Sequence, residues 1–160
     1  MSRSGKTIKH LILPDPVYNS RLVTKLINKA MYNGKKLAAA GDVYRALALY
    51  KEKNPDAEPA KILEQVVTAA APKMEVRPRR VGGASYQVPS EVRGERKTHL
   101  ALKWILEAAR RRPSKEYHTF AQKLAAEMAD TLAGTGGAIK KRDQIHKMAE
   151  ANKAFAHMKW

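Results

Sequence analysis

Hydrophobic residues recur with a helical period along most of the chain. Near the N-terminus, Asn19 or Ser20 can cap a helix that the Asn33-Gly34 pair would end. Its apolar positions share one face of that helix, namely Leu22, Val23, Leu26, Ile27, Ala30 and Met31. We therefore expect this first helix to pack against a core through that face.

Five further segments carry the same period and are separated by proline, glycine or asparagine. Pro59 stands at a favoured first-turn position, and Pro72 and Pro113 stop the helices before them. Leu106 and Trp104 fall among the positions expected in the core. The pattern predicts helices at about 37–53, 59–71, 95–112 and 117–134, and from 138 into the tail, with Tyr117 turned inward in the fifth.

Between the third and fourth helices the period changes to two, in MEVRPRRVGGASYQVPSEV at 74–92. Gly82-Gly83 is typical of a tight hairpin turn. A two-residue turn pairs Arg79 with Tyr86, Arg77 with Val88 and Arg80 with Ser85. Neither face of this hairpin is apolar enough to be buried, and isolated hairpins are marginal in water. We expect an arm that projects from the body and is stabilised by its partner.

The fold class that these patterns predict is mainly α. A single domain spanning 1–160 would contain about six helices, with a protruding two-stranded β-hairpin arm at 74–92 between the third and fourth helices. Residues 1–18 form a basic N-terminal extension and 153–160 a C-terminal tail.

The net charge of +16 favours a polyanionic partner. Segments 1–36, 73–112 and 140–160 carry 25 of the 31 Lys and Arg residues but 7 of the 15 Asp and Glu residues, which suggests a folded body with a defined cationic side. The absence of cysteine excludes disulfides and thiolate metal sites and favours a reducing compartment. No apolar run approaches the roughly 20 residues of a membrane span, and the N-terminus lacks the apolar region of a signal peptide.

Several polar patterns have two interpretations. A lysine ladder such as Lys25 and Lys29 is in most proteins a solvated helix face, but here acidic partners at i+4 are absent. The glycine-rich loop at 134–137 lacks the Gly-Lys-Ser/Thr ending of a nucleotide-binding loop, which favours a plain connection whose N–H groups could meet an RNA phosphate. The five histidines show no metal-ligand spacing, so we expect no metal site and no cofactor.

Four stretches of the chain closely resemble the bacterial-type small-subunit ribosomal protein seven family. They are LPDPVYNSRLVTKLINKAMYNGKK at 13–36, EVRPRRVGGASYQVPSEVR at 75–93, ALKWILEAARRR at 101–112 and GTGGAIKKRDQIHKMAEANKAFAHMKW at 134–160. The resemblance implies a helical body with a protruding hairpin, as the periodicity does. It further implies a structural protein of the small ribosomal subunit that is not an enzyme, in the cytoplasm or an organelle.

The resemblance also implies particular partners. Such a protein binds the 3′ major domain of 16S rRNA as a primary binder, nucleates assembly of the subunit head, and contacts tRNA and mRNA at the exit site. The implied rRNA-binding residues are Lys9, Arg21, Lys25, Lys29, Lys35, Lys36, Arg77, Arg79, Arg80, Arg93, Arg96, Arg110 and Arg111. The implied exit-site contacts are Val81, Gly82, Gly83, Ala84, Tyr86, Lys140, Lys141 and Arg142. Phe155, His157 and Trp160 would lie near small-subunit protein eleven, and protein nine is another implied neighbour.

Two other functions remain to be weighed. A DNA-binding or nucleoid protein would share the charge, but the sequence shows no distinct recognition helix with base-reading polar side chains. An RNA-modifying enzyme would need a cofactor loop or an acid/base pair, whereas the acidic residues here are scattered singly along helices. Readout of RNA shape and phosphates, with stacking by Tyr86, suits the hairpin better.

Overall fold

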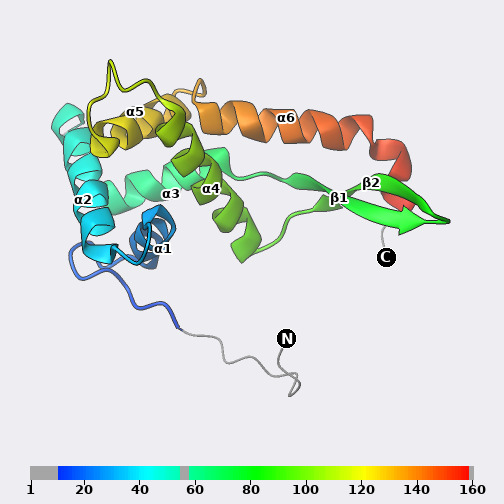
Figure 1. Ribbon diagram of the computed structural model, residues 1–160, viewed down its shortest axis with the longest axis horizontal. Coiled ribbons are helices and arrows are strands. Elements are labelled where there is room, and N and C mark those ends of the chain that lie inside the picture. Colours follow the sequence, from blue (N-terminus) through cyan, green and yellow to red (C-terminus); the bar gives the residue numbers. More distant parts are fainter. Residues whose placement is uncertain (1–10, 55–57, 159–160) are drawn as a thin grey trace.

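The computed structural model describes residues 11–54 and 58–158 and shows a mainly helical chain with a β-hairpin (Figure 1). In chain order the elements are α1 (Arg21–Ala30), α2 (Lys36–Lys53), α3 (Pro59–Ala70), β1 (Met74–Val81), β2 (Ala84–Glu91), α4 (Glu95–Arg111), α5 (Phe120–Leu132), α6 (Gly137–Ala151) and the 3-10 helix η1 (Lys153–Met158). The hairpin lies between α3 and α4, which confirms the predicted fold class.

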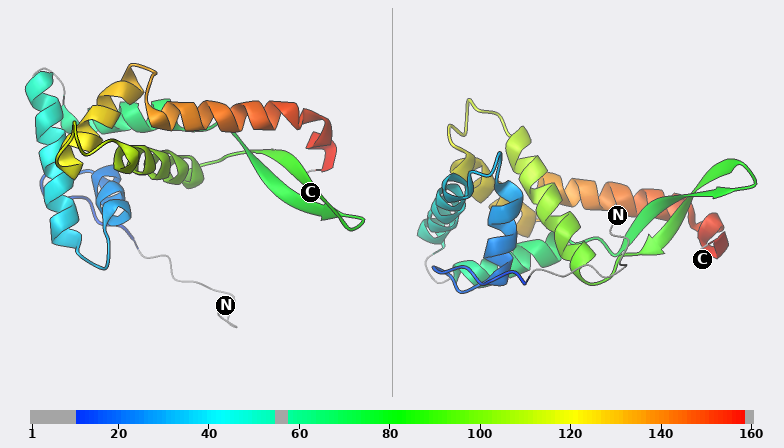
Figure 2. Two further views of the ribbon diagram at one scale, coloured as in Figure 1. Left: turned by 45° about the horizontal axis from the view of Figure 1, so that its top comes forward. Right: turned by 60° about the horizontal axis from the view of Figure 1, so that its bottom comes forward.

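Helices α1 to α5 form the body, and their apolar faces build its core. Leu26 of α1 is 0% exposed, Leu106 of α4 is 2% exposed and Trp104 is 5% exposed, which confirms the predicted helix phases. Helix α6 joins this core through Ala138 in its first turn. Ile145, two turns later, still packs against the core, and α6 runs in the same direction as the hairpin (Figures 1 and 2).

Side-chain caps set two of the helix starts. The Ser20 hydroxyl accepts a hydrogen bond from the Leu22 N–H at 3.3 Å and caps α1, as expected. Thr119 and Gln122 form a capping box, so α5 begins at Phe120. The prediction that Tyr117 is a helical core residue is therefore wrong. Tyr117 lies half-buried before the helix, with the Arg112 guanidinium 5.5 Å from its ring centroid.

The hairpin has the predicted register. Arg77 pairs with Val88, Arg79 with Tyr86 and Arg80 with Ser85. The turn favours glycine, because Gly82 and Gly83 have φ values of 57° and 89° and a type I′ turn requires positive φ at both central positions.

The base of the hairpin is buried, which corrects the expectation that neither face could be. Val88 is 2% exposed and Glu75 is 6% exposed. The covering comes from the chain itself, because α6 packs on both strands and η1 packs on β2 (Figure 1). The arm therefore has an intramolecular support that its own composition did not reveal.

Candidate nucleic-acid interface

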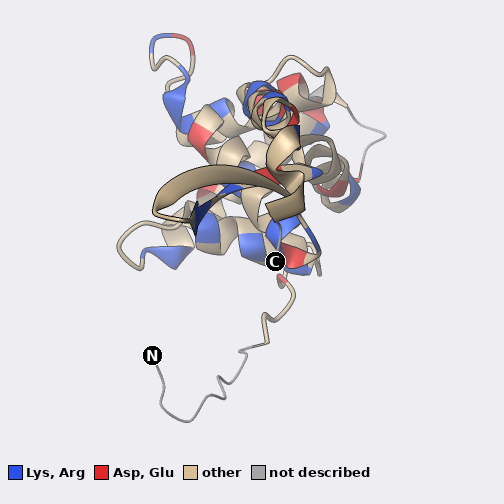
Figure 3. Ribbon diagram, turned by 90° about the vertical axis from the view of Figure 1, so that its right-hand side faces the viewer, with Lys and Arg blue, Asp and Glu red and all other residues tan. Residues whose placement is uncertain are grey.

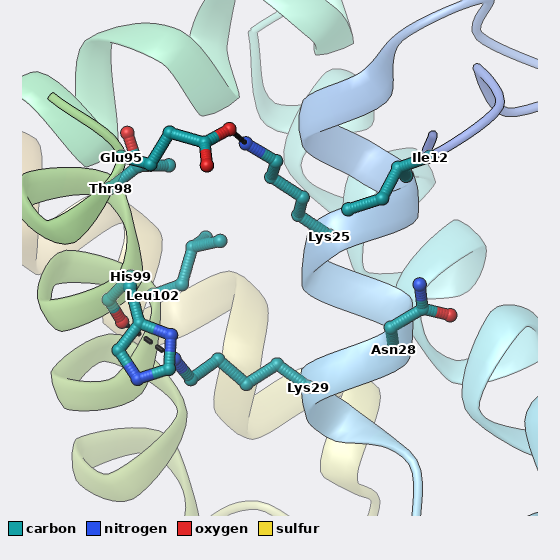
Figure 4. Close-up of a pocket in the computed structure, with 8 residues that line it drawn as sticks. All are labelled: Ile12, Lys25, Asn28, Lys29, Glu95, Thr98, His99 and Leu102. Carbon is teal, nitrogen blue, oxygen red and sulfur yellow. Dashed lines mark hydrogen bonds and ion pairs between the residues drawn. The ribbon is translucent and has the colours of Figure 1, made fainter. Parts of the chain in front are cut away.

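Two predicted RNA-binding lysines lie in the groove between α1 and α4. Figure 4 shows Lys25 and Lys29 reaching from α1 toward α4. The Lys25 Nζ lies 3.0 Å from Glu95 Oε1, and the Lys29 Nζ donates to the His99 carbonyl at 2.7 Å. Both contacts join residues 70 positions apart. The i+4 pattern along a single helix does not predict these contacts, because their partners lie on another helix.

The groove holds a pocket of about 360 Å³, lined by Ile12, Lys25, Asn28, Lys29, Glu95, Thr98, His99 and Leu102. Burial lowers the pKa of Lys29, and so does Lys103, while Glu107 opposes this. Burial likewise lowers the pKa of His99, with Lys29, Arg96 and Lys103 acting in the same direction. Mutual repulsion among cations is relieved by a bound anion. The sequence analysis had not selected His99, because its cationic neighbours lie on two helices.

At the hairpin base, one buried carboxylate binds two arginines. Glu75 Oε1 accepts a hydrogen bond from Arg77 Nε, and Glu75 Oε2 accepts one from Arg96 Nε at 2.8 Å. The two arginine side chains are 48% and 49% exposed. Glu75 therefore orients both guanidinium groups while much of each stays at the surface. One carboxylate between two guanidinium groups leaves this cluster of three side chains with a net positive charge.

Most other predicted RNA-binding residues are exposed. The exposed set comprises Arg21, Lys35, Lys36, Arg79, Arg80, Arg93 and Arg111. Arg93 makes only a long ion pair, 3.5 Å from Glu91 Oε2, and its side chain is 81% exposed. A pair of this kind contributes little to stability, so Arg93 can exchange Glu91 for a phosphate.

Arg110 and Arg142 have intramolecular partners instead. The Arg110 Nη2 donates to the Ala30 carbonyl at 3.1 Å, and its guanidinium lies 4.2 Å from the Tyr32 ring centroid. The Arg142 Nη1 donates to the Ala69 carbonyl at 2.6 Å. Each arginine thus binds a carbonyl in the last turn of a neighbouring helix, which otherwise has no intrahelical donor.

The exit-site set divides in a similar way. Gly82, Gly83 and Ala84 at the hairpin tip and Lys140 and Lys141 on α6 are exposed. Tyr86 instead contacts Phe155 of η1, with ring centroids 5.3 Å apart and planes at 48°. Tyr86, expected to contact tRNA or mRNA, thus packs against Phe155, which is expected to contact protein eleven. The His157 Nδ1 lies 2.9 Å from the Ala154 carbonyl oxygen.

Some predicted positions lie outside the described part of the chain. These are Lys9 and Trp160, while the Val81 backbone ends β1 and its side chain is not described. Among the described residues, no group of three or more His, Cys, Asp or Glu side chains is arranged to hold a metal ion. Within residues 11–54 and 58–158, no helix is both long and apolar enough to cross a membrane.

The three basic segments adjoin in space. Helix α4 packs against α1 and against α6, and it follows the hairpin directly. Helices α2 and α5, from the less basic segments, pack together at the end of the body away from the hairpin (Figure 1). Seen from the hairpin end, Lys and Arg segments surround the arm on several sides, with acidic segments among them (Figure 3). Helix α4 therefore brings parts of all three basic segments together beside the hairpin.

Comparison with known proteins accounts for this arrangement. Residues 2–153 match the family model described as ribosomal protein S7p/S5e. The chain belongs to this family. It is similar to small ribosomal subunit protein uS7 of Carboxydothermus hydrogenoformans, with 51% identity over 160 residues and all of both chains covered. The uS7 proteins of Caldicellulosiruptor bescii and Dictyoglomus thermophilum are 51% and 54% identical, again over all of both chains. Family membership confirms the resemblance seen in the four sequence stretches.

Proposed function

We propose that this chain binds the 3′ major domain of 16S rRNA as a primary binder, nucleates assembly of the subunit head, and contacts tRNA and mRNA at the exit site. As a member of its family it is a structural protein of the small ribosomal subunit. The observation that carries the finer proposal is the convergence of the three basic segments around α4 and the hairpin base.

The proposed rRNA surface combines arginines that are oriented by Glu75 with exposed lysines. Glu75 holds Arg77 and Arg96 through their Nε atoms, so the outer edges of the two guanidinium groups remain for phosphate oxygens. The exposed Lys35 and Lys36 lie where α1 connects to α2, and Lys36 lines a pocket with Ile12 and Asn28, which also line the pocket between α1 and α4. An RNA phosphate in the pocket between α1 and α4 would offset the repulsion between Lys29 and His99.

The hairpin tip has a different proposed role. Gly82, Gly83 and Ala84 are exposed and carry no charge. Because glycine lacks a Cβ, this tip can approach another nucleic-acid backbone closely. We assign it, with Lys140 and Lys141 of α6, to the tRNA and mRNA of the exit site. The C-terminal segment with η1 is assigned to small-subunit protein eleven, and protein nine is the other proposed neighbour.

Filter binding to a 3′ major domain fragment tests the rRNA assignment. Replacing both Lys35 and Lys36 with alanine should weaken binding by about a hundredfold, since charged hydrogen bonds are each worth about 1.5 kcal/mol or more. The matched control replaces Lys51 of α2 and Lys61 of α3 with alanine. Both lysines are exposed, and their replacement removes the same amount of charge. Equal losses from both pairs would show that net charge alone decides binding. Equal affinity for duplex DNA would favour a general nucleic-acid binder.

A further inference from the structure

Helix α6 holds the base of the hairpin through two side chains one helical turn apart. Arg142 Nη1 donates to the Ala69 carbonyl at 2.6 Å, and His146 Nε2 accepts the Lys73 N–H at 2.9 Å. We propose that Arg142 and His146 are positioning residues that fix the direction of the hairpin, and that protonation of His146 releases it. The part of this proposal that concerns tRNA rests on the exit-site role proposed above.

The two bonds grip both ends of the linker between α3 and β1. The Ala69 carbonyl belongs to the last turn of α3, and the Lys73 N–H directly precedes β1. Residues at i and i+4 share a helix face, so a donor at 142 and an acceptor at 146 meet a carbonyl just before the linker and the N–H at its end. Arg142 is also fixed by Asp143, whose Oδ1 lies 2.7 Å from Arg142 Nη2. The linker therefore has a defined path into the hairpin.

A second contact supports the distal part of the arm. Helix η1 continues α6 along β2, and its Phe155 ring meets the Tyr86 ring of that strand. In the views of Figures 1 and 2, α6 and the hairpin leave the body in the same direction. The hairpin is thus held at its base by hydrogen bonds and farther out by an aromatic contact.

The bond from Lys73 requires neutral His146. A ring nitrogen accepts a hydrogen bond only without its own proton, so this geometry places the proton on Nδ1. Burial lowers the pKa of His146, Arg142 and Lys73 act in the same direction, and Asp143 opposes them. These are the charged groups of α6 and the linker that act on the ring. The bonds of Arg142 and His146 to the Ala69 carbonyl and the Lys73 N–H together form a clamp on the hairpin base. Since the pKa of His146 in the folded protein lies below its ordinary value of about 6.5, the clamp is intact above pH 6.5 and is lost as pH falls through the folded-state pKa.

Hydrogen exchange and chemical shifts of the backbone amides, measured by NMR on the full chain, test the clamp. In the parent, the Lys73 amide shift should follow protonation of His146, and Lys73 and hairpin amides should exchange about fivefold faster once the ring is charged. His146→Gln keeps an acceptor near the Nε2 position and should abolish this response. His146→Leu should show fast exchange at every pH. His118→Gln, in the exposed loop before α5, is the control at each matched pH.

The same variants separate the clamp from the proposed function. A Lys73 amide that exchanges normally in His146→Leu, or titrates as in the parent in His146→Gln, overturns the clamp. Fast exchange in His146→Leu, together with poor retention of exit-site tRNA by reconstituted subunits, supports the clamp and the exit-site role. Fast exchange with normal retention supports the clamp alone and overturns the exit-site role.

Discussion

Buried carboxylates determine how several arginines of this basic chain are placed. Glu127 is 2% exposed, and its Oε2 lies 2.7 Å from Arg112 Nη2. Its other oxygen accepts the Ala138 N–H at 3.0 Å, at the start of α6. Burial lowers the pKa of Arg112, but hydrogen bonds to Asp130 and Glu127 outweigh burial and raise it overall. One glutamate therefore links the ends of α4 and α6 to α5.

Replacing Glu127 with alanine should destabilise the fold by about 3 to 5 kcal/mol, because Arg112 would lose a buried partner and the Ala138 N–H its acceptor. Chemical denaturation of the free protein measures this. The control is Glu107→Ala, which removes a 41% exposed carboxylate 3.7 Å from Lys103. It should cost less than about 1 kcal/mol. Similar costs for both variants would show that Glu127 is not the link described.

His99 should give the proposed rRNA surface a dependence on pH. In the free protein its pKa is lowered by burial and by three neighbouring cations. A phosphate beside it would raise that pKa, so the complex would bind more protons than the free protein and affinity should rise as pH falls below about 6.5. Filter binding across this range compares the parent with His99→Gln, which should lose this increment. An identical profile in both would exclude a phosphate at this position.

At the scale of elements, α6 and η1 act as a support for the hairpin. Tyr86 and Phe155 come from β2 and η1, and their rings are in contact. This contact is one reason that a two-stranded hairpin, marginal alone, keeps a defined place in the molecule. The covered base, with Val88 2% exposed, is another.

Phe155→Ala should therefore loosen the outer half of the hairpin without unfolding the body. An aromatic pair contributes about 0.5 to 1.5 kcal/mol beyond its buried area, so amides near Tyr86 should exchange several-fold faster. Phe155→Leu, which keeps apolar volume, should lie between this variant and the parent. If both variants exchange like the parent, η1 does not support the arm.

Local sequence patterns predicted the helices and strands well, but they did not predict contacts between residues far apart in the sequence. The register Arg79 with Tyr86 followed from the position of Gly82-Gly83 in the chain, because turn length fixes hairpin pairing. The partner of Lys25 is Glu95, 70 residues away, which no helical period could indicate. The resemblance implies an exit-site contact for Arg142, but its bond to the Ala69 carbonyl joins residues 73 positions apart and leaves no local pattern. Packing between helices decides which basic residues have intramolecular partners. The sequence alone therefore predicted the set of RNA-binding residues but not which of them are held by the fold.

For the whole molecule, the steepest expected dependence is on salt. If the surface around α4 neutralises about six phosphates, affinity for the 3′ major domain should fall roughly a thousandfold between about 50 and about 200 mM salt. This uses the duplex-DNA slope of about 0.9 per phosphate. Titration by filter binding measures it. An affinity that hardly changes over this range would show that charge is not the main contribution.

We propose that the body binds rRNA while the hairpin tip serves the exit site. The most direct test replaces residues 80–85 with a shorter turn, because the described side chains there are exposed and the buried base is left intact. Subunits are then reconstituted with each version, and retention of deacylated exit-site tRNA is measured beside rRNA affinity.

With the shorter turn, we expect rRNA binding to fall by about 1 kcal/mol or less per lost contact, while tRNA retention falls and errors in reading frame increase. Loss of rRNA binding with normal tRNA retention per assembled subunit would contradict this proposal and make the hairpin tip an anchor for assembly.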